Sequence, residues 1–351
     1  MVHRYKFVAA VSIGLALIGA FAGPAVQRRG SETINIHTTR DRALIEPMLR
    51  VFEGLARFKL NVTHLTSPPQ AQLKADAAAG KVDLFIAREF SQLVAAKVNG
   101  ITQAAGKAEF AKRIPEHYRD KEGHWFGLTA PPRALATSRD RVKQTTFTYE
   151  DLADQKWKGK ICIGPGLHPY NVGLVASMIA HRGASFAEVW LNGVKANLAM
   201  KPAGNDPGQL MNVHAGKCDI ALVNANYVGA LRASRDKSEQ QAAGYGVNIV
   251  FPNSADRGAH VSLSGMSLIK NAPGSNNALL LMDFLTSEPS QFIYAEENHE
   301  YPTRAGVKPS NVVASWGTPK LDALPLDKIA YLQGQATELI KKVGFDNGPG
   351  I

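Results

Sequence analysis

The chain has 351 residues, a formal net charge of +10 at pH 7 and two cysteines. Its lysines and arginines are scattered and form only short clusters, and no nucleic-acid-binding module is present, so the sequence argues against a nucleic-acid partner. The positive charge instead favours anionic ligands or a membrane surface.

The first residues predict a signal peptide over 1–22. His3, Arg4 and Lys6 precede an apolar run that ends in a small-residue cleavage pattern at Ala22. The run is shorter than the roughly eighteen apolar residues expected of a membrane-spanning helix. No cysteine follows it directly, so a lipid anchor is not indicated. We therefore expect a periplasmic chain that is cleaved near Ala22.

Strand-like and helix-like segments then alternate along the chain. Leu44, Met48, Phe52 and Leu55 recur at helical spacing and predict a helix over Leu44–Phe58. We expect strands at 33–37, 60–63, 82–86, 134–138, 161–163, 220–223 and 248–251, and further helices at 172–181, 186–199, 209–215 and 227–233. This alternation predicts an α/β fold with mixed, mostly parallel sheets. Ligands of such sheets bind outside the carboxyl ends of the strands, where helices begin.

Two segments rich in helix- and strand-breaking residues, 123–132 and 251–258, divide the chain. They predict a two-lobe protein with a cleft between the lobes. We expect 31–132 and 253–320 to form the first lobe, 133–252 the second, and 321–351 a C-terminal helix and tail, with the helix over Asp327–Lys342 and a polar, Gly-rich tail over Phe345–Ile351.

The two cysteines, Cys162 and Cys218, lie near the tyrosines that follow them, Tyr170 and Tyr227, where strand-like runs give way to helix-like ones. Because an exported chain meets an oxidising compartment, we expect a disulfide between them. It would close a loop of about 57 residues and stabilise the fold by about 4 kcal/mol in the chain-entropy model. The alternative is a pair of buried thiols.

Those tyrosines, Tyr170 and Tyr227, are the main candidates for a binding site. A free phenol has a pKa near 10, but a bound trivalent cation would remove its proton. The resulting phenolate is a hard, anionic ligand that suits ferric iron. The alternative is that both rings are packed and their hydroxyls are hydrogen-bonded. No nucleophile elbow, phosphate loop or His-Glu-x-x-His motif is present, which favours a binding protein over an enzyme.

Polar residues after the first predicted strand are further candidates. His37 could ligate a metal, Arg40 could hold an oxyanion through its fork of donors, and Asp41 could cap the following helix. His168 and Asp206 also lie near predicted helix starts, where Asp206 precedes a proline and fits a structural cap.

An ordered series of short motifs runs through nearly the whole chain beyond the signal peptide. It includes His-Trp-Phe-Gly-Leu-Thr (124–129), Tyr-Glu-Asp-Leu-Ala-Asp (149–154), Trp-Lys-Gly-Lys-Ile-Cys-Ile (157–163), Tyr-Asn (170–171), Cys-Asp-Ile-Ala-Leu (218–222) and His-Glu-Tyr-Pro (299–302). The series resembles the periplasmic ferric-iron-binding proteins of ABC importers, the bacterial transferrins. The resemblance implies a type II periplasmic binding protein, whose two α/β lobes close on a ligand, with delivery to a membrane permease and no catalysis.

The resemblance also implies ligand positions. In tyrosine-rich relatives the positions of Tyr170 and Tyr227 supply phenolates. Relatives usually have a tyrosine pair where this chain has Asn226-Tyr227, so one expected phenolate is a neutral amide. The first-strand motif also differs, because Thr39-Arg40-Asp41-Arg42 stands where many relatives have Tyr-Ser-x-Arg followed by tyrosine or histidine.

We therefore expect a receptor for ferric iron, either bare or chelated. The expected metal ligands are Tyr170 and Tyr227, with Asp41, His37 and Asn226 as weaker candidates. A buried trivalent ion needs several anionic partners. We thus expect a synergistic anion such as carbonate or citrate, held by Arg40 and Arg42.

The expected partners are the membrane subunits of an ABC permease, and the expected receptor is a monomer. Two alternatives stay open. One is a receptor for an organic or oxyanionic solute without direct metal coordination, which Asn226 and the basic first-strand segment motivate. The other is an exported enzyme on the same fold, supported only by the His, Asp and Arg residues near the cleft.

Overall fold

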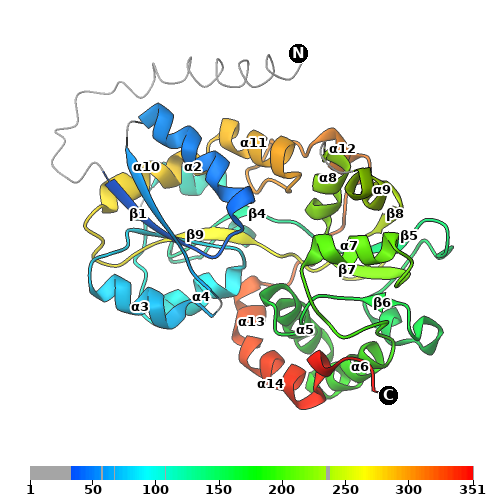
Figure 1. Ribbon diagram of the computed structural model, residues 1–351. Coiled ribbons are helices and arrows are strands. Elements are labelled where there is room, and N and C mark those ends of the chain that lie inside the picture. Colours follow the sequence, from blue (N-terminus) through cyan, green and yellow to red (C-terminus); the bar gives the residue numbers. More distant parts are fainter. Residues whose placement is uncertain (1–32, 57, 67, 107, 235–237, 351) are drawn as a thin grey trace, which may run out of the picture.

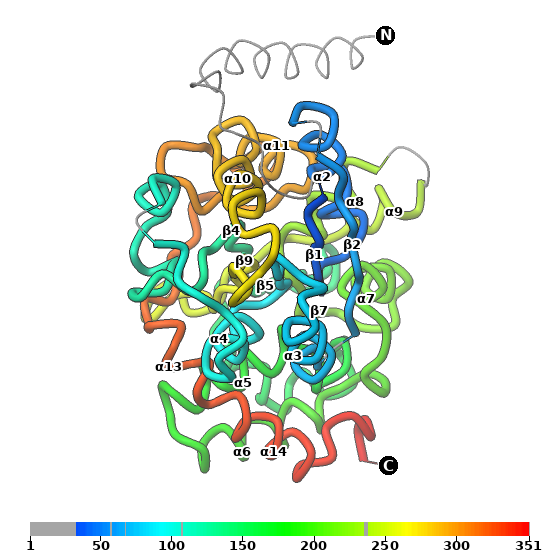
Figure 2. Tube along the Cα trace, turned by 90° about the vertical axis from the view of Figure 1, so that its left-hand side faces the viewer, coloured from blue at the N-terminus to red at the C-terminus, as the bar shows by residue number. Residues whose placement is uncertain are grey.

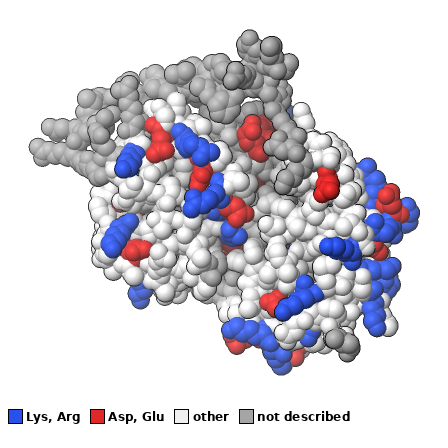
Figure 3. All heavy atoms as spheres, viewed as in Figure 1, with Lys and Arg blue, Asp and Glu red and all other residues white. Residues whose placement is uncertain are grey.

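Two lobes lie side by side, and each is built around one β-sheet with helices on both faces (Figures 1 and 2). The computed structural model describes residues 33–350 except 57, 67, 107 and 235–237. The predicted signal peptide, 1–22, lies outside these residues. No helix among the described residues has the length and apolar character needed to cross a membrane. On the face shown in Figure 3, basic and acidic side chains are interspersed.

The first sheet has the strand order β2-β1-β3-β9-β4. Its strands are β1 (Thr33–Thr38), β2 (Lys59–His64), β3 (Leu84–Ala87), β4 (Phe126–Thr129) and β9 (Ser264–Leu268). Figure 2 shows helices α2 (Arg42–Ala56), α10 (Ser275–Leu285) and α11 (Glu288–Asn298) on one side of this sheet, and α3 (Gln70–Ala78) and α4 (Phe90–Val98) on the other. Ile34 and Ile36 of β1 are fully buried, and α2 packs Ile45, Met48 and Phe52 into the same core.

The second sheet has the order β6-β7-β5-β8. Its strands are β5 (Arg133–Ser138), β6 (Ile161–Cys162), β7 (Ile220–Asn224) and β8 (Val247–Val250). Its helices are α5 (Pro169–Arg182), α6 (Ala184–Ala196), α7 (Asp206–His214), α8 (Ala225–Ala233) and α9 (Ser238–Tyr245). Helix α5 follows β6 after a short loop, and α8 follows β7 directly, so both helices begin beyond the carboxyl ends of strands.

The sheets are mixed, as expected, but parallel pairs do not predominate among the described strands. β1 pairs in parallel with β2 and β3, and β6 with β7. Every antiparallel pair involves β5 or β9. These two strands each follow a crossing of the chain from one lobe to the other, and each enters its sheet in the reverse direction. The sequence pattern does not record this reversal.

The C-terminal segment differs from the single helix predicted over Asp327–Lys342. The structure has two helices there, α13 (Leu326–Tyr331) and α14 (Gln333–Val343). They separate at Leu332, and both contact α5; α13 also contacts α4 of the first lobe, whereas α14 also contacts α6 of the second. The predicted polar tail also contains a short 3-10 turn (Phe345–Asn347), whose Phe345 is buried in the core of the second lobe.

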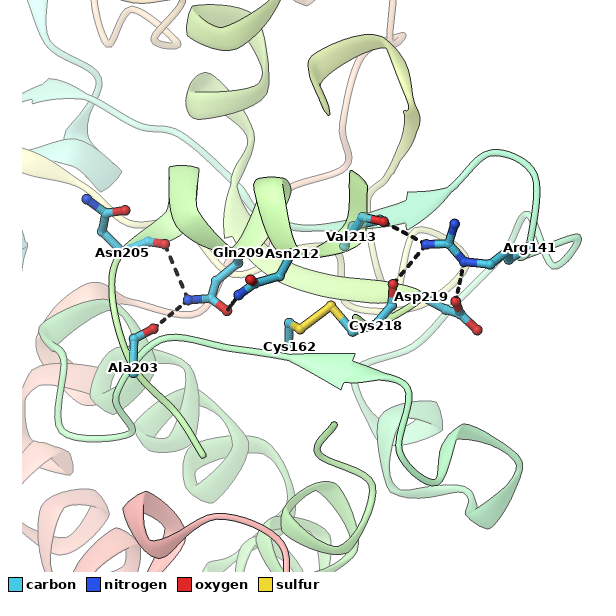
Figure 4. Close-up of a disulfide and its surroundings, with 9 residues drawn as sticks. All are labelled: Arg141, Cys162, Ala203, Asn205, Gln209, Asn212, Val213, Cys218 and Asp219. Carbon is cyan, nitrogen blue, oxygen red and sulfur yellow. Dashed lines mark hydrogen bonds and ion pairs between the residues drawn. A yellow bond between two sulfur atoms is a disulfide. The ribbon is translucent and has the colours of Figure 1, made fainter. Parts of the chain in front are cut away.

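Cys162 and Cys218 form the predicted disulfide (Figure 4), with their Cα atoms 5.9 Å apart. It joins β6 to the turn before β7, two strands that also pair in parallel. Arg141 supports the same turn, since it pairs with Asp219 and donates to the carbonyl oxygens of Val213 and Cys218. The disulfide therefore fixes the two strands that lead to α5 and α8.

Candidate functional site

A pocket between the lobes collects polar side chains from both. Its empty volume is about 270 Å³, part of which is open to solvent. It is lined by Arg40, Asp41, Leu44, Arg88, Pro131, Tyr170, Asn226, Ser262, Ser264 and Glu300. A second space, of about 400 Å³ including open solvent, lies against the second lobe and has almost entirely apolar walls, so it is poorly suited to an ion. The inter-lobe pocket is therefore the candidate site.

Tyr170 lies in the first turn of α5. Pro169 begins this helix, and the backbone N–H of Tyr170 donates to Nδ1 of His168, the N-cap, at 3.3 Å. The tyrosine side chain lines the pocket and is buried. Burial raises the pKa of Tyr170 to about 12, although the nearby Arg88 acts to lower it. The phenol is thus neutral at pH 7 unless a cation displaces its proton.

Tyr227 is the third residue of α8, and its hydroxyl donates to Oδ2 of Asp41 at 2.8 Å. This hydrogen bond joins the two lobes. Burial, followed by the effects of Tyr170 and Asp41, raises the pKa of Tyr227 well above 10. Tyr170 and Tyr227 also influence each other's pKa, so the two phenol side chains lie near each other. Two phenols and one carboxylate therefore meet between the lobes.

Arg88 follows β3 and connects the same residues. Its Nη2 lies 2.6 Å from Oδ1 of Asp41, its Nε donates to the carbonyl oxygen of Thr39 at 2.6 Å, and its Nη1 lies 3.3 Å from Nε2 of His168. Burial lowers the pKa of His168 to about 4, so the imidazole ring is neutral at pH 7. Arg88 is therefore a cationic group beside Asp41 and Tyr170.

Arg40 also lines the pocket, but its charge has a fixed partner. Its Nη2 lies 2.6 Å from Oε2 of Glu300, and its Nη1 donates to Thr129 at 3.3 Å and to Ser264. The guanidinium carbon lies 5.6 Å from the ring centroid of Tyr294. Both members of the ion pair are buried, so separating them would leave an unpaired charge in the protein. Arg40 thus holds Glu300 at the pocket wall.

Five of the candidate residues are not among those that line the pocket. Tyr227 and His168 adjoin it through contacts with Asp41 and Arg88, whereas the other three lie apart from it. His37 lies on β1, and its Nε2 is 2.9 Å from Oδ2 of Asp76. Arg42 is exposed on α2 and pairs with Glu46 at 2.8 Å. Asp206 is buried, pairs with Arg133 at 2.6 Å and accepts a hydrogen bond from the backbone N–H of Asn224. All three side chains have structural partners elsewhere.

Asn226 does line the pocket, as the residue before Tyr227 in α8. Its side chain is 2 % exposed, and its Oδ1 accepts no hydrogen bond from any residue that the structure describes. A buried amide oxygen without a donor is costly, so it is suited to a ligand that supplies one.

Sequence reasoning missed several lining residues, chiefly Arg88, Ser262, Ser264 and Glu300. Arg88 comes directly after the end of β3, and the rule that selected the tyrosines would have selected it too. Glu300 stands in the His-Glu-Tyr-Pro motif, but its pairing with Arg40 spans 260 positions of the chain, so no local pattern reveals it.

Comparison with known proteins agrees with this architecture. Residues 79–320 match the family described as bacterial extracellular solute-binding protein. The chain is 33 % identical over 316 residues to iron uptake protein A1 of Synechocystis sp., covering 90 % of this chain and 88 % of that protein. The crystal structure of apo ferric ion-binding protein A of Pasteurella haemolytica has a TM-score of 0.86 and 35 % identity, with 90 % of this chain and 99 % of that chain covered. The structure of Trichodesmium IdiA (FutA) in complex with iron and citrate ligands has a TM-score of 0.81 and 34 % identity, and the match covers 89 % of this chain and 99 % of that chain. The chain therefore belongs to the family of bacterial extracellular solute-binding proteins.

Proposed function

We propose that the protein captures ferric iron in the periplasm and delivers it to the membrane subunits of an ABC permease. The observation that carries this proposal is that Tyr170 and Asp41 line the inter-lobe pocket while the Tyr227 hydroxyl donates to Asp41 from the other lobe. Two relatives support the proposal: iron uptake protein A1 and ferric ion-binding protein A each resemble this chain over about nine tenths of its length. Both halves of the site come from one chain, which favours a monomeric receptor.

The chemistry of these groups fits a trivalent cation. In the metal-free form the Tyr227 proton bridges two oxygens, the phenol oxygen and Oδ2 of Asp41, at 2.8 Å. A ferric ion can replace that proton and draw the same oxygens together, because its charge stabilises both anions. Loading must also remove the Tyr170 proton, so binding releases protons and weakens as the pH falls. Tyr170, Tyr227 and Asp41 are the proposed protein ligands.

A charge count supports an accompanying anion. In the pocket Arg40 is paired with Glu300 and Arg88 with Asp41, and both phenols are neutral without metal. A trivalent ion that displaces two protons leaves one uncompensated positive charge. A carbonate or a chelating carboxylate such as citrate would neutralise it. Asn226 adds no charge and is proposed as a weak, neutral contact to iron through its unpaired Oδ1.

The second candidate function is that of a receptor for an organic or oxyanionic solute without direct metal coordination. It is favoured by Asn226, whose amide occupies the position of one expected phenolate and has an unpaired oxygen in the pocket. Membership of a solute-binding family supports binding rather than catalysis in either case.

Visible spectroscopy tests the proposal. Metal-stripped protein would be titrated with ferric citrate beside the Tyr170→Phe, Tyr227→Phe double variant. We expect a phenolate-to-iron charge-transfer band in the wild type and none in the double variant. A wild type without the band, yet thermally stabilised by iron-free citrate, would replace ferric coordination with the solute-receptor function.

A further inference from the structure

Arg88 is the one guanidinium in the pocket lining whose ionic partner is partly exposed. The Arg88 side chain is 22 % exposed, and that of Asp41 is 42 % exposed. Arg40 and Glu300, by contrast, are 2 % and 4 % exposed. A partly exposed pair can exchange partners at little cost, because water solvates the separated charges, whereas a fully buried pair cannot. Arg88 is therefore free to take another anion.

The backbone of the first lobe also holds Arg88 in place. Its Nε donates to the carbonyl oxygen of Thr39 at 2.6 Å, and its own backbone N–H donates to the Thr39 hydroxyl at 3.0 Å. With Nε engaged, the two terminal nitrogens point towards Asp41 and His168. Such an anchored fork presents two parallel N–H donors to a planar anion with two oxygens.

Loading of the site would release Asp41 from Arg88. Asp41 uses Oδ2 to accept from Tyr227 and Oδ1 to accept from Arg88. A cation bound between the lobes would compete with Arg88 for the negative charge of Asp41. The carboxylate then draws towards the cation and away from Arg88.

We propose that Arg88, rather than Arg40 or Arg42, anchors the planar oxyanion that accompanies ferric iron in this protein. The anion is a carboxylate of an organic chelate or a carbonate, both of which offer two coplanar oxygens to the guanidinium. On loading, Arg88 exchanges the carboxylate of Asp41 for this anion, which supplies the missing negative charge. This inference rests on the proposed ferric-iron function.

The test counts anions as well as iron. Metal-stripped wild-type protein would be loaded with a ferric salt in the presence of either radiolabelled citrate or radiolabelled bicarbonate, then desalted. We expect about one labelled anion per iron in one of the two arms, and this arm identifies the source of the oxyanion. Retention of neither label would overturn the inference.

The variant that decides the role of Arg88 is Arg88→Gln, with Arg88→Lys to retain the charge without the fork. We expect both to lose the labelled anion and to bind iron more than about tenfold more weakly when the anion is present. The matched control is Arg42→Gln, which removes a guanidinium from the exposed face of α2 and should behave as the wild type. Circular dichroism of all three variants would verify that they fold.

The Arg88 assignment and the ferric function can be refuted separately. A normal charge-transfer band and full anion retention in Arg88→Gln would overturn the Arg88 assignment and leave the ferric function intact. Anion loss in Arg40→Gln with retention in Arg88→Gln would return the role to Arg40. A wild type without any charge-transfer band would overturn both the ferric function and this inference.

Discussion

Glu89 offers a quantitative test of how tightly the lobes pack behind the pocket. It caps α4 by accepting from the backbone N–H of Ser91 at 2.9 Å, and it has no exposed surface. Its Oε1 accepts no hydrogen bond from any described residue. Gly173 of α5, in the second lobe, packs against Glu89. A Cβ added at Gly173 would lie 3.5 Å from Oε1 of Glu89 and 3.1 Å from Nε2 of His260.

Burial raises the pKa of Glu89 from 4.5 to about 7, although hydrogen bonds from Ser91 and Gln333 act to lower it. Because the folded state binds the proton more tightly than the unfolded state, the folded state is progressively destabilised as the pH rises from 4.5 through about 7. At about 1.4 kcal/mol for each pKa unit, the full effect is on the order of 3 kcal/mol. Replacing Glu89 by Gln removes this titration and keeps an acceptor for Ser91.

The assay is urea unfolding of wild type and Glu89→Gln at intervals from pH 4.5 to pH 8.5. We expect similar free energies of unfolding at pH 4.5 and a Glu89→Gln variant that is more stable by on the order of 3 kcal/mol above pH 7. Burial lowers the pKa of His260 to about 4, which gives the opposite slope between pH 6.5 and 4 in both proteins. The difference between the two proteins at each pH therefore isolates Glu89. Glu297→Gln, at an exposed position of α11, is the matched control. A difference that stays constant across the range would refute the reasoning.

Three further predictions concern the elements that carry the phenols. Replacing both Cys162 and Cys218 by Ala should lower the free energy of unfolding by about 4 kcal/mol, measured by urea unfolding of the oxidised wild type and the variant; equal midpoints would contradict the stabilising role of the disulfide. Gly229→Ala should destabilise by about 1–3 kcal/mol and weaken the ferric band, because a Cβ there would lie 2.6 Å from Cβ of His299 and displace α8 with Tyr227. An unchanged melting temperature would show that α8 can shift freely. Asn226→Tyr should strengthen both the band and iron affinity by supplying a third phenolate in the pocket, and an unaltered band would mean that position 226 does not reach the ion.

The position of the candidate site could be predicted from the sequence because it depends on local patterns. Strand-like runs before Tyr170 and Tyr227 placed both residues at helix starts, which is where α5 and α8 begin. The strands β4 and β9 were not predicted, because each contains a glycine at a position where neighbouring atoms leave little room for a side chain. In β9, Gly265 lies so close to β4 that a Cβ would come within 2.5 Å of the carbonyl oxygen of Phe126. A strand rich in Gly and Ser gives no apolar signal.

The partners of the charged residues could not be predicted, because they lie far apart in the chain. Residue type alone marks Arg40 as an anion clamp and His37 as a metal ligand, whereas the structure pairs Arg40 with Glu300 and His37 with Asp76. Neither partner is marked by spacing or by a motif next to the residue that it binds. Residue type therefore identified which groups could act, whereas the fold decided which were already engaged.

The central claim is that one ferric ion binds to the phenols of Tyr170 and Tyr227 between the lobes. Anomalous diffraction at the iron edge from crystals of the loaded protein tests it most directly. We expect a single iron peak within bonding distance of both phenol oxygens, with the Asp41 carboxylate turned towards it. An iron peak elsewhere, or iron held in the pocket only by its chelator while Tyr227 still donates to Asp41, would contradict it.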